Sequence, residues 1–122
     1  MAFETIRLTD PATGSTAKIL PRRGFNCYSF QAAPADQLIE VLWADPQFTS
    51  GATRAARSGI PLLFPFAGRL RGTSFNYSGR RYEVEVGDDF GNAIHGFVID
   101  RPWRVVQQSE SSAVGQFQAS RD

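Results

Sequence analysis

The chain has 122 residues, of which 13 are basic and 12 acidic, so its net charge is +1, and 42% of its residues are hydrophobic. These values are typical of a single soluble globular domain, which we expect to span residues 1–122. The balanced charge argues against polyanionic partners, so we expect neither nucleic acid nor a membrane surface among them.

Cysteine content and the N-terminus indicate the compartment. Cys27 is the only cysteine, which excludes an internal disulfide and a zinc site built of cysteines. Residues 1–5 have neither the basic nor the apolar region of a signal peptide. The apolar run at residues 60–67 is too short to span a membrane. We therefore expect a cytoplasmic protein.

Alternation of polar and apolar residues predicts short β-strands along the chain. In the first half they fall at residues 4–9, 16–20, 26–30 and 38–43, the last of them mostly buried. A long connection follows at residues 45–59, in which residues 52–57 could form a short helix. In the second half, residues 73–77 and 81–86 predict a hairpin, and strands follow at residues 103–108 and 113–119. Because no long window shows a helical apolar stripe, the pattern predicts an all-β, antiparallel β-sandwich.

Residues 59–72 do not suit a regular strand. Pro61 and Pro65 lack the N–H group that a central ladder requires. An apolar, proline-stiffened segment that ends in Arg69 suits the wall of a pocket. The alternative is an edge segment with Arg69 in solvent.

His95, the only histidine, is followed by Gly96, which permits close approach of backbone or ligand. Histidine can donate or accept a proton near neutral pH, so His95 is a candidate catalytic residue, with a structural role as the alternative. The hairpin between Arg69 and His95 returns the chain toward its start. We therefore expect both side chains to face one cavity. Asp88 and Asp89, close to His95 in the sequence, are expected to form a solvated turn.

Five short segments in this order resemble the aldose 1-epimerase (galactose mutarotase) family. They are Gly-Ile-Pro-Leu-Leu-Phe-Pro-Phe at residues 59–66, Gly-Arg at 68–69, Tyr-Ser-Gly-Arg-Arg-Tyr at 77–82, His-Gly-Phe at 95–97 and Pro-Trp at 102–103. The resemblance implies the N-terminal portion of a large antiparallel β-supersandwich, and residues 1–122 would then be an incomplete domain. One departure is Gly68, where many members have asparagine.

The resemblance also implies a reaction, the interconversion of the α and β anomers of a hexose by acid/base ring opening. Arg69 would bind sugar hydroxyls through its fixed donor fork. His95, the catalytic candidate, would donate to the sugar near its ring or anomeric oxygen. Phe97, with Phe66 and Trp103, would supply apolar surface, although core packing is the alternative for each. No metal or organic cofactor is required.

The family's glutamate base, second histidine and sugar-binding aspartate belong to the portion of its fold that follows. The resemblance therefore implies that this chain carries the sugar-binding Arg/His part and, alone, is not an efficient isomerase. We expect a homo-oligomer, or a separate chain with the remaining part, to cover the sheet edge left exposed after residues 113–119.

Four other readings compete with this one. A non-catalytic carbohydrate-binding module needs the same arginine and histidine but no base. A hexose-6-phosphate mutarotase-like member would use an arginine cluster for phosphate. A purely structural interaction domain would present residues 38–43 to a partner. A Cys27–His95 nucleophilic pair is the fourth, although the strand context of Cys27 suits a buried, inert thiol. The arginines of the second reading are Arg54, Arg57, Arg69 and Arg71.

Overall fold

The computed structural model describes residues 2–119, and every pairing between its named strands is antiparallel. Within these residues there are short 3-10 turns but no α-helix, and thus no helix long and apolar enough to cross a membrane. The all-β, antiparallel prediction is therefore confirmed. The chain forms two compact units, one made of the residues up to Leu62 and from Val98 onward, the other of Leu63–Phe97. We call them unit 1 and unit 2.

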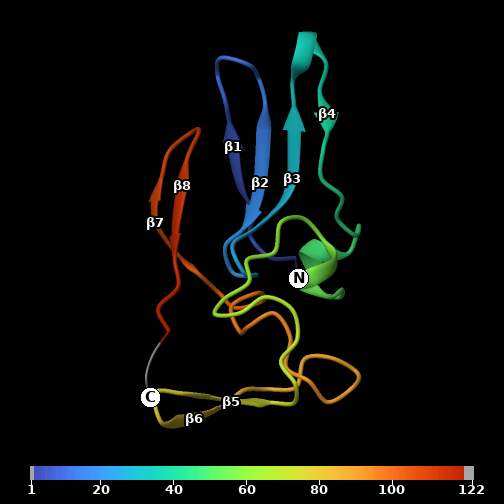
Figure 1. Cartoon of the computed structure of the whole chain (residues 1–122). Coiled ribbons are helices and arrows are strands. Elements are labelled where there is room, and N and C mark those ends of the chain that lie inside the picture. The colour runs from blue at the N-terminus through green and yellow to red at the C-terminus, as the bar shows by residue number, and fades with distance from the viewer. Residues whose placement is uncertain (1, 120–122) are drawn as a thin grey trace. The chain divides into compact units, whose positions relative to one another are not determined.

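Unit 1 is built on a four-stranded sheet in the order β1-β2-β3-β4 (Figure 1). Ile6 and Ile19 are partners in the β1–β2 register, and both are buried, as expected from the alternating pattern. A β-bulge between Lys18 and Ile19 shifts the register of β2 against β3. The strands are β1 (Ile6–Thr9), β2 (Thr16–Leu20), β3 (Asn26–Ala32) and β4 (Ile39–Glu40).

The edge strand β4 corrects one prediction. A mostly buried strand over residues 38–43 is wrong, because only Ile39 and Glu40 pair, with Ala32 and Gln31 of β3. Leu38 is 60% and Trp43 66% exposed. An apolar run predicts burial only where other elements cover it, and among residues 2–119 nothing buries these side chains.

The core of unit 1 lies where the sheet meets the connection at residues 45–59. Leu20 and Phe48 are fully buried there, and Ala55 is 7% exposed. This connection contains two 3-10 turns, η2 (Phe48–Ser50) and η3 (Ala55–Arg57), the second within the segment where a short helix was considered. A further 3-10 turn, η1 (Pro34–Asp36), links β3 and β4.

A buried arginine ties this connection to the sheet. Arg23 is 5% exposed and donates hydrogen bonds to the carbonyl oxygens of Phe48 and Thr53. Its guanidinium also lies 4.3 Å from the centre of the Phe48 ring, a cation–π contact. Burial lowers the pKa of Arg23, and the charge of Asp100 partly counters this effect.

Strands β7 (Arg104–Gln108) and β8 (Ala113–Gln116) form an antiparallel hairpin in unit 1. Trp103, just before β7, packs within this unit, with its ring centre 5.9 Å from that of Phe25 and 5.7 Å from that of Phe117. Its indole N–H donates to the Val98 carbonyl oxygen at 3.3 Å. These contacts support core packing for Trp103.

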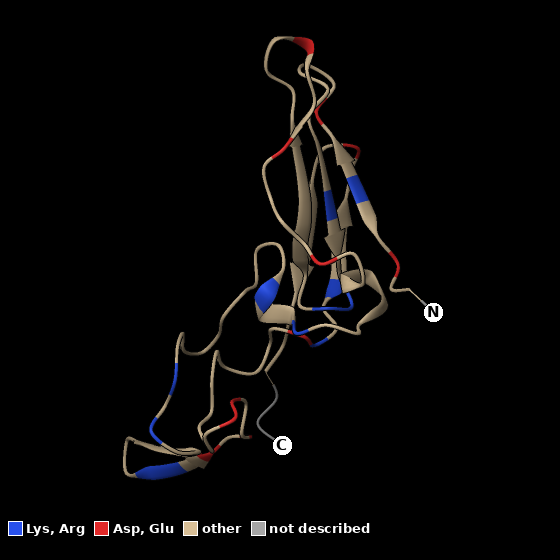
Figure 2. Cartoon of the chain, turned by 90° about the vertical axis from the view of Figure 1, so that its right-hand side faces the viewer, with Lys and Arg blue, Asp and Glu red and all other residues tan. Residues whose placement is uncertain are grey.

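Unit 2 contains the predicted hairpin, formed by β5 (Ser74–Tyr77) and β6 (Arg80–Glu83). Its two turn residues, Ser78 and Gly79, both have positive φ (51° and 73°), as a type I′ turn requires. Phe75 and Tyr82 are partners in the register and stack with their ring centres 5.2 Å apart. Acidic and basic residues occur in both units (Figure 2), in line with the balanced composition.

Candidate functional site

The Arg69 segment enters unit 2 in irregular backbone, as the two prolines predicted. Between residues 61 and 73 the only β-pairing is two isolated bridges, Phe64 with Gly96 and Arg69 with Ile94. The amide N–H of Phe97 donates to the Phe64 carbonyl oxygen at 2.9 Å. The segment that carries His95 is therefore hydrogen-bonded alongside the segment that carries Arg69.

The structure brings the two predicted site residues onto neighbouring backbone positions. Arg69 is bridged to Ile94, the residue before His95. The His95 N–H donates to the Gly68 carbonyl oxygen at 2.9 Å, and the Leu70 N–H donates to the Ala93 carbonyl oxygen at 2.9 Å. The expectation that the hairpin returns the chain to its start is thus confirmed. The shared cavity that we expected around the two side chains stays a prediction.

The His95 ring is oriented by the same backbone. Its Nδ1 accepts a hydrogen bond of 3.3 Å from the Gly68 N–H. A nitrogen that accepts carries no proton, so in the neutral ring the proton lies on Nε2. His95 therefore presents Nε2–H as a donor. Gly68 contributes to this arrangement through its backbone.

Gly96 is required by its surroundings. Its φ is +70°, and a Cβ atom placed on it would lie 1.9 Å from the Phe64 carbonyl oxygen. His95 itself has a φ of 62°, a left-handed conformation that is uncommon for a residue with a side chain. The close approach that the His-Gly pair predicted is thus an approach of backbone, and it sets the position of His95.

The turn predicted at Asp88 and Asp89 forms, and Asp89 is exposed, but the carboxylate of Asp88 is not solvated as we expected. Its side chain is 4% exposed, and its Oδ2 accepts a hydrogen bond of 2.7 Å from Nε of Arg69. Oδ1 accepts from the backbone N–H groups of Phe90 (2.9 Å) and Asn92 (2.8 Å). The error came from treating a charged pair in a turn as exposed. The spacing Asp-x-Phe-x-Asn was the available signal, since an aspartate often accepts from backbone N–H groups that follow it.

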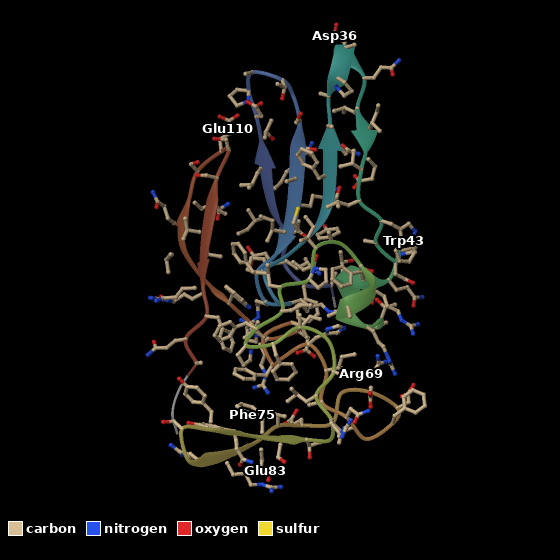
Figure 3. The ribbon with its side chains drawn as sticks, viewed as in Figure 1. Asp36, Trp43, Arg69, Phe75, Glu83 and Glu110 are labelled. Carbon is tan, nitrogen blue, oxygen red and sulfur yellow. The ribbon has the colours of Figure 1, made fainter. Side chains whose placement is uncertain are left out.

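The electrostatics of this carboxylate follow from its partners. Burial alone would raise the pKa of Asp88. The hydrogen bonds from Asn92, Phe90 and Arg69 outweigh burial and hold the pKa of Asp88 well below its ordinary value. Asp88 is therefore an anion throughout the physiological pH range, and it pairs with a guanidinium whose side chain is 56% exposed. Arg69 is labelled in Figure 3.

Phe97, the third predicted site residue, is 36% exposed. Phe64, whose carbonyl oxygen accepts a hydrogen bond from the Phe97 N–H, is 56% exposed. Unit 2 thus has exposed aromatic side chains on the two segments that carry Arg69 and His95. Its role toward a ligand stays a prediction.

Other candidate features lie in unit 1. A hollow of about 420 Å³ is lined by Pro102, Arg104 and residues 116–118, and contains none of the predicted site residues. Burial raises the pKa of the Cys27 thiol, which agrees with an inert cysteine. Among residues 2–119, no three or more His, Cys, Asp and Glu residues are grouped to hold a metal ion.

Comparison with known proteins defines the class of protein that this antiparallel fold and its Arg/His segment represent. The family model "Aldose 1-epimerase" matches residues 4–120. The chain therefore belongs to the aldose 1-epimerase family. No curated protein matches it.

Solved structures agree with this assignment. The Slr1438 protein of Synechocystis sp. PCC 6803 is 29% identical and superposes with a TM-score of 0.68 over 89% of this chain. The GalM/aldose epimerase homologue of C. elegans is 20% identical, with a TM-score of 0.70 over 92% of this chain. The chain spans 34% of the length of each of these two proteins. The prediction of the N-terminal portion of a mutarotase-like β-sandwich is confirmed.

Proposed function

We propose that this chain carries the sugar-binding Arg/His part of an aldose 1-epimerase-like isomerase. The observation that supports this most is that backbone contacts hold Arg69 and His95 at neighbouring positions of unit 2. Asp88 accepts from Nε of Arg69 and Nδ1 of His95 accepts from Gly68, which leaves the Nη groups and Nε2–H as donors for a ligand. Family membership supports the reaction class, and the geometry of unit 2 supports the choice of residues. The substrate is a hexose.

In this proposal Arg69 binds sugar hydroxyls through its terminal Nη groups, since Nε is occupied by Asp88. His95 donates from Nε2 toward the ring or anomeric oxygen and stabilises the charge that develops when the C1–O5 bond breaks. Phe97 supplies an apolar face to the sugar ring. After rotation about C1–C2, the ring closes on its other face.

Anomer exchange also needs a base for the proton of the anomeric hydroxyl and an acid that protonates the ring oxygen as the C1–O5 bond breaks. We propose that both groups belong to the portion of the family fold that corresponds to the other two thirds of the solved relatives. Residues 1–122 by themselves then bind sugar without accelerating its mutarotation.

Titration calorimetry and polarimetry test this function together. We expect saturable binding of glucose or galactose, and no mutarotation of α-glucose above the buffer rate. Arg69→Ala should weaken binding about 10- to 150-fold, the effect of losing hydrogen bonds worth about 1.5–3 kcal/mol to a charged group. Arg81→Ala, which removes an arginine of β6 whose side chain is 67% exposed against 56% for Arg69, serves as the control and should leave binding unchanged. Binding that survives Arg69→Ala would contradict the assignment of the site.

The same measurements separate the neighbouring alternatives. A carbohydrate-binding module keeps the binding but stays inactive when the remaining portion of the fold is supplied. A hexose-6-phosphate mutarotase-like member would bind glucose 6-phosphate more tightly than glucose, with a strong dependence on salt. The observation that supports this alternative is that Arg69 and Arg71 lie two positions apart in one segment of unit 2.

The exposed apolar residues around β4 suggest where a protein partner binds. Leu38, Ile39, Val41 and Trp43 are each at least 46% exposed at the edge of the sheet. We propose that a polypeptide surface covers them in the assembled protein, either a second copy or a complementing chain. Sedimentation velocity of the wild-type chain and of Trp43→Glu tests the first case, since the variant should be monomeric. A wild-type monomer at every concentration would contradict a homo-oligomer.

A further inference from the structure

We propose that Asp88 is a positioning residue for Arg69, which holds the guanidinium by Nε alone so that both Nη groups remain available to a sugar. This inference rests on the proposed function. It adds a residue that takes no part in the family resemblance, and a division of labour within one arginine side chain.

The contact between the two side chains is a single one. Oδ2 of Asp88 lies 2.7 Å from Nε of Arg69, and this pairing uses neither Nη atom of the guanidinium. Carboxylates frequently pair with arginine through two parallel bonds, which would also occupy an Nη group. Here Asp88 accepts from Nε alone, and this pairing leaves the Nη donors of the guanidinium unused.

The remaining acceptor positions of the Asp88 carboxylate are also occupied. Oδ1 already accepts two backbone N–H groups, those of Phe90 and Asn92. Oδ2 accepts the side-chain amide of Asn92 at 3.1 Å in addition to Nε of Arg69. Four donors fix the orientation of the carboxylate, so Asp88 cannot turn to form a second bond with Arg69.

This anchor is itself tied to the segment that carries Arg69. The side-chain oxygen of Asn92 accepts from the Gly72 N–H at 2.9 Å, and the Ala93 N–H donates to the Gly72 carbonyl oxygen at 2.8 Å. The Gly87 N–H donates to the Asn92 carbonyl oxygen at 2.9 Å. The loop and the Arg69 segment therefore hold each other in place, and the guanidinium is oriented before any ligand binds.

Unit 2 contains a matched pair with the same contact and none of this support. On β6, Nε of Arg81 lies 2.6 Å from Oε1 of Glu83, with side chains 67% and 63% exposed. Such a solvated pair orients little, because water competes for both partners. Glu83→Gln is therefore the control for Asp88→Asn (Figure 3 labels Glu83 and Arg69).

The first test is glucose and galactose binding by calorimetry. In Asp88→Asn the amide oxygen can still accept the backbone N–H groups, but the amide nitrogen cannot accept from Nε. We expect binding to weaken about 2- to 150-fold, the range that coupling between contacting residues spans. Glu83→Gln should bind as the wild type does. Wild-type affinity in Asp88→Asn, with Arg69→Ala weakened, overturns the proposal and leaves the proposed function standing.

A positioning role also predicts non-additivity. In the Arg69→Ala background, Asp88→Asn should cause no further loss of affinity, whereas a general effect on the fold would lower affinity in both backgrounds and overturn the proposal. The Arg69 Nε–H proton resonance gives a readout without sugar. It should exchange slowly with water in the wild type and rapidly in Asp88→Asn, while that of Arg81 is fast in both. Equal exchange at Arg69 in the two proteins overturns the proposal.

Arg69→Lys is a second variant that leaves the loop intact. One ammonium cannot serve Asp88 and the sugar in the way that the fork does. We expect affinity close to that of Arg69→Ala, and wild-type affinity in Arg69→Lys would overturn the proposal. A wild-type chain that binds neither glucose nor galactose overturns the proposed function. This outcome is distinct from those above, because calorimetry then detects no binding heat for the wild type or for any variant.

Discussion

The substitution Gly96→Ala tests whether close backbone packing sets the position of His95. The added Cβ would lie 1.9 Å from the Phe64 carbonyl oxygen, whereas an ordinary contact begins at 3.4 Å. The segments that carry Gly96 and Phe64 must therefore move apart by about 1.5 Å. An alanine at positive φ costs about 1–2 kcal/mol, and overpacking of this kind costs about 1–3 kcal/mol. We therefore expect unit 2 to lose about 2–5 kcal/mol of local stability.

Amide hydrogen exchange by NMR measures this loss at the affected bonds. The N–H groups of His95 and Phe97, which donate to Gly68 and Phe64, report the opening free energy of the two bridged chains. Gly91→Ala is the control, since Gly91 also has a positive φ (+82°) but open space around its Cβ position. It should cost only the conformational part, about 1–2 kcal/mol. Equal losses in the two variants would refute the argument that contact with Phe64 makes glycine necessary at residue 96.

Three further predictions concern the core, the carboxylate and the thiol. Phe48→Ala should lower the unfolding free energy by about 3–5 kcal/mol in denaturant titration, because Phe48 is fully buried, while Phe90→Ala at an 82% exposed position should stay within about 0.5 kcal/mol. Because the pKa of Asp88 is lowered on folding, its stabilisation is complete above the unfolded value of about 3.9 and is lost as the pH falls through the folded value. Wild-type hydrogen exchange in unit 2 should therefore accelerate in acid, and Asp88→Asn should remove that component. Because burial raises the pKa of Cys27, a thiol reagent should modify it slowly at neutral pH and rapidly in urea, and fast labelling of the folded chain would contradict this.

Local sequence patterns predicted much of the fold. The β5–β6 hairpin followed from alternation on either side of a short Gly-containing link at residues 78–80, because a tight turn is a local property. The structure shortens that link to Ser78 and Gly79, since Arg80 pairs with Tyr77. The irregular path through Pro61 and Pro65 followed from their missing N–H groups. The meeting of the Arg69 and His95 segments followed from the hairpin between them.

Predictions that needed knowledge of distant neighbours were the ones that were wrong. Residues 38–43 have an apolar pattern that is typical of a covered strand, yet Trp43 is 66% exposed because no described element covers it. Asp88 has the composition of a surface turn, yet its carboxylate is enclosed by donors from Phe90, Asn92 and Arg69. The Phe90 and Asn92 donors follow Asp88 closely and could be read from a local window, whereas the contact with Arg69 and the exposure of Trp43 could not.

The amino-acid sequence alone determined the strand pattern, the hairpin, the family and the residue types available for chemistry. Those properties depend on periodicity, turn conformation and a short ordered set of motifs, all of which are local or additive along the chain. The tertiary structure alone decided which donor of Arg69 is free, which nitrogen of His95 carries the proton, and why residue 96 is glycine. These depend on atoms that meet across 19 to 32 positions of the chain, where the contact partner and not the residue type sets the outcome.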